Sequence, residues 1–274
     1  MVMGSKEIHS ILKRHSITPS RSLGQNFVTD PNTIRKIVHL ADINSSDHVL
    51  EIGPGLGSLT CELANAAQVV VIEFDRYLIP ALREALEDSD MLERTEIVEA
   101  DAMEIHWKDF FSTRDANWKM ISNLPYNIAS PLLLDVLDSA HQVKEIIVMV
   151  QREVGERFTA RMGTPAYGIP SVKAQYWSDV SIVGRIPPQV FFPVPKVESV
   201  LLQFKRRASV EPVDLEMLWR LVRTGFGQRR KMLRKSLRDV VRPLGFEIAG
   251  LDSTMRPQDL TVQDWVALAN ACKS

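Results

Sequence analysis

The sequence predicts an α/β fold: a Rossmann-like, mostly parallel sheet of seven strands with a small all-helical domain at the C-terminus. Three observations predict it. In roughly the first half of the chain, short apolar runs alternate with stretches of helical spacing, which is typical of parallel strands covered by helices on both faces. A glycine-rich turn joins the first such run to the helix after it. From about Asp214 onwards the apolar spacing is helical throughout.

The first part of the chain supplies five strands and the helices between them. In residues 31–41, Ile34, Ile37 and Val38 recur at helical spacing, with Asp30 placed to cap the helix and Pro31 at its first position. Nearly continuous apolar runs predict strands at 48–53, 69–75, 95–101, 118–124 and 145–151. Amphipathic stretches predict helices at 58–67, 77–86, 130–139 and 152–162.

Two long β-like segments complete the expected sheet, at residues 172–186 and 198–207. No helical stretch separates them, so we expect them to pair antiparallel at the edge of the sheet. The connector, residues 187–196, contains four prolines, which should keep it extended and outside the sheet. We therefore expect a catalytic α/β domain over residues 1–207 and a helical domain over residues 208–274. Breaks near Pro243 and Pro257 divide the latter.

Composition is that of an ordinary globular protein of 274 residues, with 45% hydrophobic and 24% charged residues. No run approaches the ~18 apolar residues of a membrane span, and no secretory signal is visible. Only two cysteines occur, and the histidines show no metal-ligand spacing. We expect a cytoplasmic protein without a membrane or metal partner, and a monomer.

The formal net charge of −1 conceals a strongly uneven distribution. Between Lys205 and Arg242 there are twelve Lys or Arg residues against four Asp or Glu residues, and residues 1–36 hold six against two. Clustered positive charge in an otherwise acidic chain indicates a polyanionic partner that is contacted at defined places. A solvated helix face is the alternative explanation.

The glycine-rich turn and two carboxylates predict a cofactor site. Gly53 and Gly55 let the backbone turn sharply after a strand and approach a ligand closely. The turn has the form G-x-G-x-G and lacks the third glycine of the dinucleotide fingerprint. Glu73 ends the second strand, where an acid can bind both ribose hydroxyls, and Asp101 follows the third. Together these features fit S-adenosylmethionine better than a nucleotide phosphate.

The fourth strand ends in the tetrapeptide Asn123-Leu124-Pro125-Tyr126. In an open parallel sheet, ligands bind outside the carboxyl ends of the strands, so the tetrapeptide should face the cofactor. The Asn123 amide oxygen and the Leu124 carbonyl can accept both N–H bonds of an exocyclic amine, which directs its lone pair at a methyl group. Pro125 stiffens the loop, and Tyr126 offers a flat face for stacking an extruded base.

These motifs, in this order, resemble those of the ribosomal RNA adenine N6,N6-dimethyltransferases, which have a class I methyltransferase fold. The resemblance covers nearly the whole chain. A small departure is Ser122, which stands where glycine is common in the family. The matching segments are LGQNFVTD (23–30), EIGPGLGSLT (51–60), EFD (73–75), EADAMEI (99–105), SNLPYNIASPLL (122–133), PPQVFFPVPKVES (187–199) and FGQRRKMLRKSL (226–237).

The resemblance implies dimethylation of two adjacent adenosines in a loop near the 3′ end of 16S rRNA, in the small ribosomal subunit. It also implies roles for individual residues. Phe191 would sandwich the target adenine against Tyr126. The residues implied to contact S-adenosylmethionine are Asn26, Val28, Gly53, Glu73, Asp101 and Asn123. Those implied to contact the RNA backbone are Gln228, Arg229, Arg230, Lys231, Arg234, Lys235 and Arg238.

Two other functions remain open at this point. One is an erythromycin-resistance-type methylase that acts on 23S rRNA, although the C-terminal QRRK segment at residues 228–231 is more similar to the ribosomal branch. The other is a binding protein, such as a ribosome assembly factor, that has kept the fold and lost the chemistry. An intact N-L-P-Y motif and the three cofactor elements argue against it, because a pure binder does not need them.

Overall fold

The computed structural model describes residues 3–20, 22–114 and 117–272. The chain folds into two compact units, and each is made of segments that are separate in the sequence. The first runs up to Gly155 and includes Ser181–Arg206; the second consists of Glu156–Val180 and the chain from Arg207 onwards.

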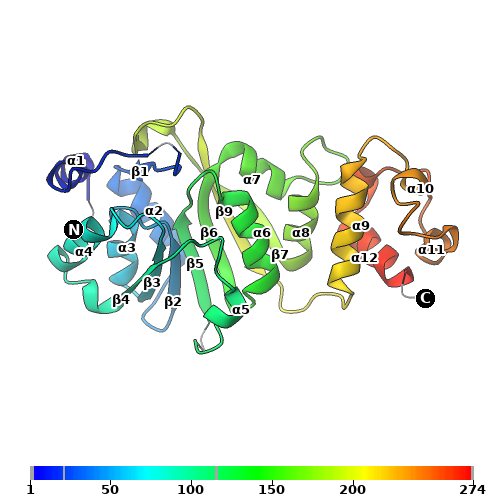
Figure 1. Cartoon of the computed structure of the whole chain (residues 1–274), viewed down its shortest axis with the longest axis horizontal. Helices are drawn as coiled ribbons and strands as arrows, with labels where there is room; N and C mark the ends of the chain where they lie inside the picture. Colours follow the sequence, from blue (N-terminus) through cyan, green and yellow to red (C-terminus); the bar gives the residue numbers. More distant parts are fainter. Residues whose placement is uncertain (1–2, 21, 115–116, 273–274) are drawn as a thin grey trace. The chain divides into compact units, whose positions relative to one another are not determined.

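A seven-stranded sheet forms the centre of the first unit (Figure 1). Its strand order is β4-β3-β2-β5-β6-β9-β7. The pairs β2·β3, β3·β4, β2·β5 and β5·β6 are parallel, and β9 runs antiparallel to β6. The seven-stranded, mostly parallel sheet is therefore confirmed. The strands are β2 (His48–Ile52), β3 (Gln68–Glu73), β4 (Thr95–Glu99), β5 (Trp118–Asn123), β6 (Val143–Gln151), β7 (Ser178–Ile186) and β9 (Ser199–Arg206).

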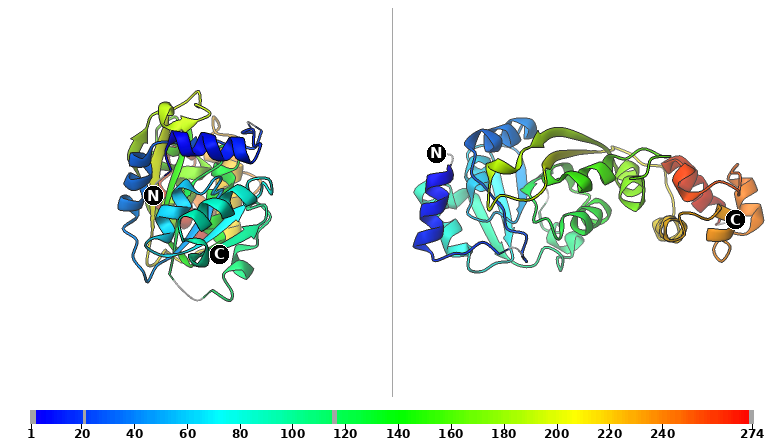
Figure 2. Two further views of the ribbon diagram at one scale, coloured as in Figure 1. Left: turned by 90° about the vertical axis from the view of Figure 1, so that its left-hand side faces the viewer. Right: turned by 90° about the horizontal axis from the view of Figure 1, so that it is seen from above.

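Helices cover both faces of this sheet (Figure 2). Val49, Val71, Ile121 and Ile147 point to one face and share a buried core with the helices there. That face carries α2 (Pro31–Ala41), α3 (Ser58–Ala64) and α4 (Ile79–Asp88), and the other carries α5 (Trp107–Phe110) and α6 (Ala129–Ser139). Burial on both faces explains why the strands appear in the sequence as continuous apolar runs.

Ser122 links the carboxyl ends of two neighbouring strands, β2 and β5. The pairing of β2 with β5 extends from His48 and Trp118 to Leu50 and Met120. Two residues further on, the Ile52 N–H donates to the buried Ser122 hydroxyl, with N···O at 2.9 Å. A glycine at position 122 could not accept this bond.

The proline-rich connector lies outside the seven-stranded sheet, as expected, but it forms a ribbon that the sequence did not indicate. In this ribbon β8 (Phe191–Phe192) pairs antiparallel with β1 (Phe27–Val28). The helix α1 (Ser5–Arg14) lies beside it (Figure 2), and its His9 ring is 4.4 Å from the ring of Phe192. Short 3₁₀ turns occupy Leu92–Arg94 and Pro188–Val190.

The second unit is helical, as expected for the C-terminal part. It contains α8 (Ile169–Trp177), α9 (Leu215–Gly227), α10 (Leu233–Ser236), α11 (Pro243–Ile248), a 3₁₀ turn (Pro257–Asp259) and α12 (Val262–Ala271). α7 (Arg152–Thr159) leads into it from β6.

Residues 172–177 were expected in a strand, and this expectation is wrong because they belong to α8. Pro170 near the helix start and Ser171, whose hydroxyl accepts the Gly168 N–H, favour the helix. Tertiary packing then determines the outcome, since the Tyr176 ring meets Trp219 of α9 edge-on at 5.6 Å. The segment 156–180 thus lies with the second unit, whereas the sequence assigned it to the first.

Candidate cofactor pocket and nucleic-acid interface

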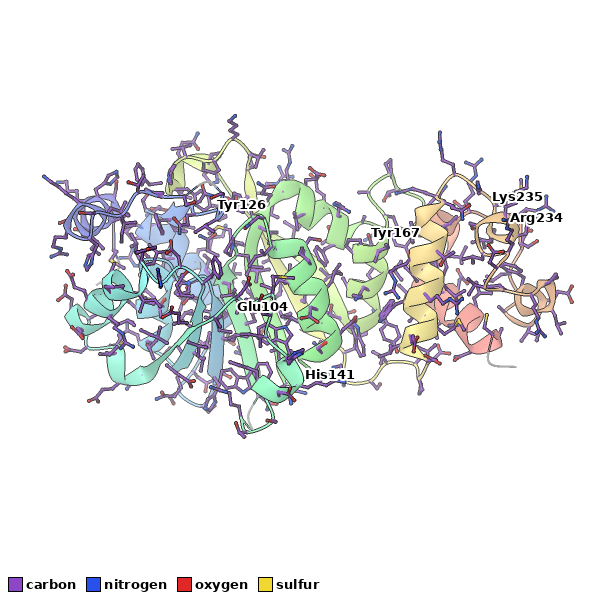
Figure 3. The ribbon with its side chains drawn as sticks, in the orientation of Figure 1. Glu104, Tyr126, His141, Tyr167, Arg234 and Lys235 are labelled. Atoms are coloured by element: carbon purple, nitrogen blue, oxygen red, sulfur yellow. The ribbon has the colours of Figure 1, made fainter. Side chains whose placement is uncertain are left out.

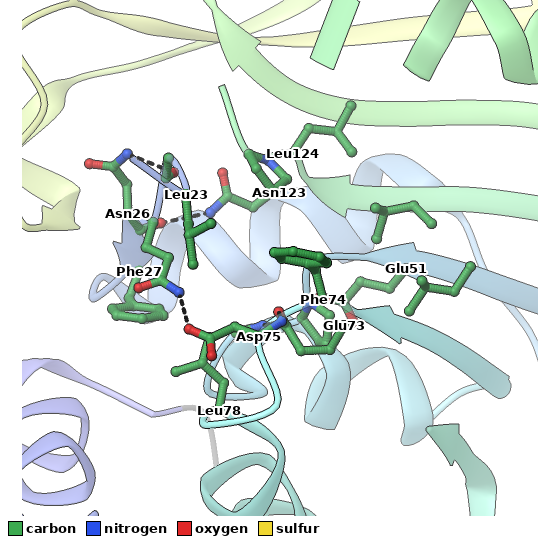
Figure 4. Close-up of a pocket in the computed structure, with 18 of the residues that line it drawn as sticks. Leu23, Asn26, Phe27, Glu51, Glu73, Phe74, Asp75, Leu78, Asn123 and Leu124 are labelled. Carbon is green, nitrogen blue, oxygen red and sulfur yellow. Dashed lines mark hydrogen bonds between the residues drawn. The ribbon is translucent and has the colours of Figure 1, made fainter. Parts of the chain in front are cut away.

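A single pocket at the carboxyl ends of β2 to β5 collects nearly all of the predicted cofactor and catalytic residues (Figure 4). Such an edge is where parallel sheets bind ligands. Phe191 is the exception. The predicted residues that line the pocket are Asn26, Val28, Gly53, Gly55, Glu73, Asp101, Asn123, Leu124, Pro125 and Tyr126.

The glycine-rich turn forms the base of the pocket and requires glycine for two reasons. Gly53 and Gly55 adopt φ values of +67° and +59°, a region that side chains rarely occupy. A Cβ atom at Gly53 would lie 3.1 Å from the ring of Pro125, and one at Gly55 would lie 3.0 Å from the ring of Phe27. The turn therefore stays close to the N-L-P-Y loop on one side and to β1 on the other.

Glu73 is buried and tied to the backbone around it. Its carboxylate accepts the N–H groups of Gly55 at 3.1 Å and of Asp75 at 2.8 Å. Burial raises the pKa of Glu73 to about 7, and these two bonds only partly offset that effect. Asp101 is more accessible, and it accepts the Met103 N–H at 2.8 Å. Both carboxylates lie where the sequence placed them, at the ends of neighbouring strands.

Residues 22–28, here called the N-terminal strap, close one side of the pocket. Three side-chain bonds hold the strap, and Figure 4 draws those that end on Asp75 and on the Asn26 carbonyl. Gln25 Nε2 donates to Asp75 at 2.8 Å, Asn123 Nδ2 donates to the Asn26 carbonyl at 2.9 Å, and Asn127 Nδ2 donates to the Ser22 carbonyl at 3.4 Å. The Asn26 side chain itself bonds to the Gly24 carbonyl within the strap. Val28 is buried and pairs with Phe191.

Asn123 has a fixed orientation with a vacant acceptor. Its Nδ2 is occupied by the Asn26 carbonyl, so the amide is held one way round. Within the described part of the chain, its Oδ1 is buried without a hydrogen-bond partner. Buried polar atoms normally have partners, so an orphaned acceptor here indicates a donor that arrives with a ligand. An exocyclic amine is a donor of this kind.

The rest of the tetrapeptide is held firmly as well. The Leu124 side chain is buried, and its N–H donates to the Met149 carbonyl of β6 at 3.2 Å. The Tyr126 hydroxyl lies 2.7 Å from the hydroxyl of Ser199, a fully buried residue of β9. Burial raises the pKa of Tyr126 above its ordinary value. Tyr126 is thus a neutral aromatic face whose position is fixed at its far end.

Phe191 is buried outside the pocket, whereas its predicted role is to stack on the target adenine. It is 2% exposed, pairs with Val28 in the β1–β8 ribbon, and does not line the pocket. Its ring packs in the core, so it offers no open face for a base in this conformation. The sandwich with Tyr126 stays a prediction that requires the ribbon to move.

The structure adds residues that the sequence analysis missed. Gln25 and Asp75 tie the strap to β3, Ser199 holds Tyr126, and Glu51 is a buried carboxylate in the pocket wall. Of these, only Glu51 left a signal in the sequence, as a charged residue inside an otherwise apolar strand. The others depend on contacts between distant segments.

The predicted RNA-binding residues gather around the C-terminal end of α9 and along α10 in the second unit. Gln228, Arg230, Lys231 and the α10 cations are exposed, and Figure 3 labels Arg234 and Lys235 among them. Arg238 is exposed beside Asp239. Arg229 is half-buried, its guanidinium donates to the Thr164 carbonyl at 3.0 Å, and it lies near the Phe226 ring, so its contact with RNA stays a prediction. Arg229 therefore contributes to the packing of the unit.

The described residues contain no group of three or more potential metal ligands. The helices of that part of the chain include none that is long and apolar enough to cross a bilayer.

Known proteins resemble this chain along nearly its whole length. A small-subunit ribosomal RNA methyltransferase A from Bifidobacterium adolescentis is 38% identical over 98% of this chain and 94% of its own. The protein of the same description from Corynebacterium efficiens is 37% identical over 100% of this chain and 97% of its own.

Solved structures confirm the class I methyltransferase fold. A dimethyladenosine transferase from Plasmodium falciparum superposes with a TM-score of 0.73 at 24% identity, covering 87% of this chain and 94% of its own. The 23S rRNA methyltransferase ErmE superposes with a TM-score of 0.67 at 24% identity, covering 90% of this chain and 100% of its own.

The family model described as ribosomal RNA adenine dimethylase matches residues 18–274, which include the glycine-rich turn, the tetrapeptide and the basic α9–α10 segment. This chain therefore belongs to the ribosomal RNA adenine dimethylase family and is an rRNA methyltransferase.

Proposed function

We propose that this protein transfers methyl groups from S-adenosylmethionine to N6 of two adjacent adenosines, in a loop near the 3′ end of 16S rRNA within the small ribosomal subunit. The observation that carries the proposal is Asn123, whose amide is oriented by the strap and whose Oδ1 is an acceptor without a partner among the described residues. The relatives that are 36–38% identical are described as small-subunit enzymes, which favours 16S over 23S rRNA as the substrate.

The pocket fits S-adenosylmethionine by its chemistry. The glycine-rich turn lines the pocket with backbone that carries no side chain at Gly53 and Gly55, and Glu73 and Asp101 are acceptors suited to the ribose hydroxyls and the adenine amine. Bound there, the cofactor would supply an electrophilic methyl group. Glu73, Asp101, the strap and the turn would hold it, and the reaction needs no metal.

The chain's own residues account for the positioning of the nucleophile. Asn123 Oδ1 and the Leu124 carbonyl accept the two N–H bonds of the adenine amine, so its lone pair points at the methyl group. Tyr126, fixed by Ser199, stacks on the extruded base. The amine proton leaves to water after attack, so no general base is required.

The second unit supports RNA binding through its exposed cations. Arg230, Lys231, Arg234, Lys235 and Arg238 are exposed, and long cationic side chains of this kind contact phosphates. Phosphate contacts give affinity without sequence information, so recognition of the loop falls to the pocket. We propose that the protein acts as a cytoplasmic monomer.

Methylation of purified ribosomal subunits tests the function. Unmethylated small subunits, large subunits and both free rRNAs would be incubated with labelled S-adenosylmethionine, and the RNA digested for mass spectrometry. We expect dimethyladenosine in 16S rRNA alone, and its loss with Asn123→Ala. Label in 23S rRNA would favour a resistance-type methylase. No transfer to either RNA would favour a non-catalytic assembly factor.

A further inference from the structure

The cofactor pocket has a one-sided charge. Four carboxylates line it, those of Glu51, Glu73, Asp75 and Asp101, and the described residues around it include no Lys, Arg or His. Two of the four, Glu51 and Glu73, are almost fully buried. Buried charges normally have a partner of opposite sign, because their desolvation is costly. The described pocket wall provides no such partner.

Of the two buried carboxylates, Glu51 has the fewer hydrogen bonds. It lies on β2, is 1% exposed, and its Oε2 has no hydrogen-bond partner among the described residues. Glu73, in contrast, accepts two backbone N–H groups, from Gly55 and Asp75. Hydrogen bonds from donors favour the ionised form. Of the two buried carboxyl groups, Glu51 should therefore keep its proton to the higher pH.

The groups that surround Glu51 strengthen this assignment. Glu73 of β3 is the acidic neighbour that acts on Glu51, Asp75 and Asp101 line the same pocket, and α3 contributes the neutral Thr60 and Cys61. Burial raises the pKa of Glu51 to about 8, and the nearby Glu73 adds to the rise. The Asn123 amide at the end of β5 is uncharged.

We propose that Glu51 selects the charge of the cofactor: it holds a proton while the pocket is empty and releases that proton to solvent when a cationic ligand binds. The inference rests on the proposed function, which makes the ligand S-adenosylmethionine. That cofactor carries a sulfonium and an ammonium group against one carboxylate, so its net charge is +1. An ionised Glu51 in a pocket of low dielectric stabilises this charge strongly.

The same residue would discriminate between cofactor and product. S-adenosylhomocysteine has lost the sulfonium charge, so it gains less from an ionised Glu51 and displaces less of the proton. The pocket therefore binds the product of methyl transfer, S-adenosylhomocysteine, more weakly than it binds the cofactor. Glu51 is thus a specificity-determining residue that favours loading of the charged cofactor and release of the neutral product.

Proton linkage sets the direction and size of the effect. Because the pKa of Glu51 is about 8, the empty pocket is mostly protonated at Glu51 at neutral pH and below, and the proton must be removed before the ionised form can act. The affinity for S-adenosylmethionine should fall as the pH is lowered and be about 15-fold weaker at pH 6.5 than at pH 8, if one proton is released. The affinity for S-adenosylhomocysteine should change less over the same range.

Titration calorimetry of the wild-type protein in buffers with different ionisation enthalpies tests the proposal directly, because it counts protons. We expect about one proton from Glu51 per S-adenosylmethionine at pH 7, and clearly fewer in total for S-adenosylhomocysteine; Glu73, with a pKa of about 7, can add up to about half a proton with either ligand. Release of no proton, or equal release with both ligands, would overturn the proposal. Failure to bind S-adenosylmethionine at all would instead overturn the proposed function.

Two variants locate the proton. Glu51→Gln, a neutral isostere, should abolish most of the pH dependence and bring the affinities for the two ligands closer together. Glu104→Gln makes the same substitution at an exposed site three residues after Asp101 and should behave as wild type. If Glu51→Gln kept the proton release while retaining its native circular dichroism, the proton would belong to another group. The number of protons that the wild-type protein releases tests the proposal even if the Glu51→Gln variant does not fold.

Discussion

Asn123→Ala separates the positioning of the amine from the binding of the cofactor. The variant loses the orphaned Oδ1 and the 2.9 Å bond from Nδ2 to the Asn26 carbonyl. Removing one positioned transition-state contact costs about 10²- to 10³-fold in turnover, or ~3–4 kcal/mol. The Asn26 carbonyl also loses its donor, which should destabilise the closed position of the strap by ~1–3 kcal/mol. Since Glu73 and Asp101 are untouched, affinity for S-adenosylmethionine should stay within about tenfold of wild type.

Single-turnover methyl transfer to small subunits and calorimetric cofactor binding would be measured side by side. The matched control is Asn127→Ala, which loses a longer bond of 3.4 Å to the same strap, at Ser22, and should lower the rate less than about fivefold. Asn123→Asp keeps an acceptor but cannot donate to Asn26, so it should lose less turnover than Asn123→Ala. Near-normal turnover of Asn123→Ala, or equal defects in both alanine variants, would refute the reasoning.

Three further outcomes follow from the same contacts. Glu73→Ala should weaken S-adenosylmethionine about 10- to 100-fold, because the ribose loses a charged acceptor worth ~1.5–3 kcal/mol; unchanged affinity by calorimetry would remove Glu73 from the site. Ser199→Ala should raise KM for the RNA about fivefold by freeing Tyr126. Tyr126→Phe should raise KM for the RNA by the same factor, and the double variant should raise it no further. Additive effects of the two substitutions would argue against coupling between Ser199 and Tyr126. Replacing three exposed cations by alanine should reduce the slope of log K against log salt by about two units, with equal loss for matched and scrambled RNA; a loss confined to the cognate RNA would indicate base readout. The three are Arg230, Lys231 and Arg234.

The sheet and the ends of its strands could be predicted because their physical cause is local. Strands buried on both faces have continuous apolar sequences, and the carboxyl ends of parallel strands meet at one edge. Glu73 and Asp101 could therefore be placed together from the order of the strands alone. Residues 172–177 could not be assigned in this way, since their apolar spacing fits a strand as well as a helix and the packing of Tyr176 on Trp219 decides.

The rest of the site depends on contacts that no local pattern reveals. Gln25 and Asp75 are 50 residues apart in sequence, and Tyr126 and Ser199 are 73 apart. The sequence shows that Glu51 is charged, but only the structure shows that it is buried and that its Oε2 has no partner among the described residues. Phe191 was assigned by resemblance to a known family, and its burial in the β1–β8 ribbon could not be read from the sequence either.

The most direct test of the central claim is to map dimethyladenosine in ribosomal RNA from cells with and without this protein. We predict that two adjacent N6,N6-dimethyladenosines near the 3′ end of 16S rRNA disappear when the protein is removed. They should return with the wild-type chain but not with Asn123→Ala. Persistence of both modified adenosines in cells that lack the protein, or their restoration by Asn123→Ala, would contradict the account.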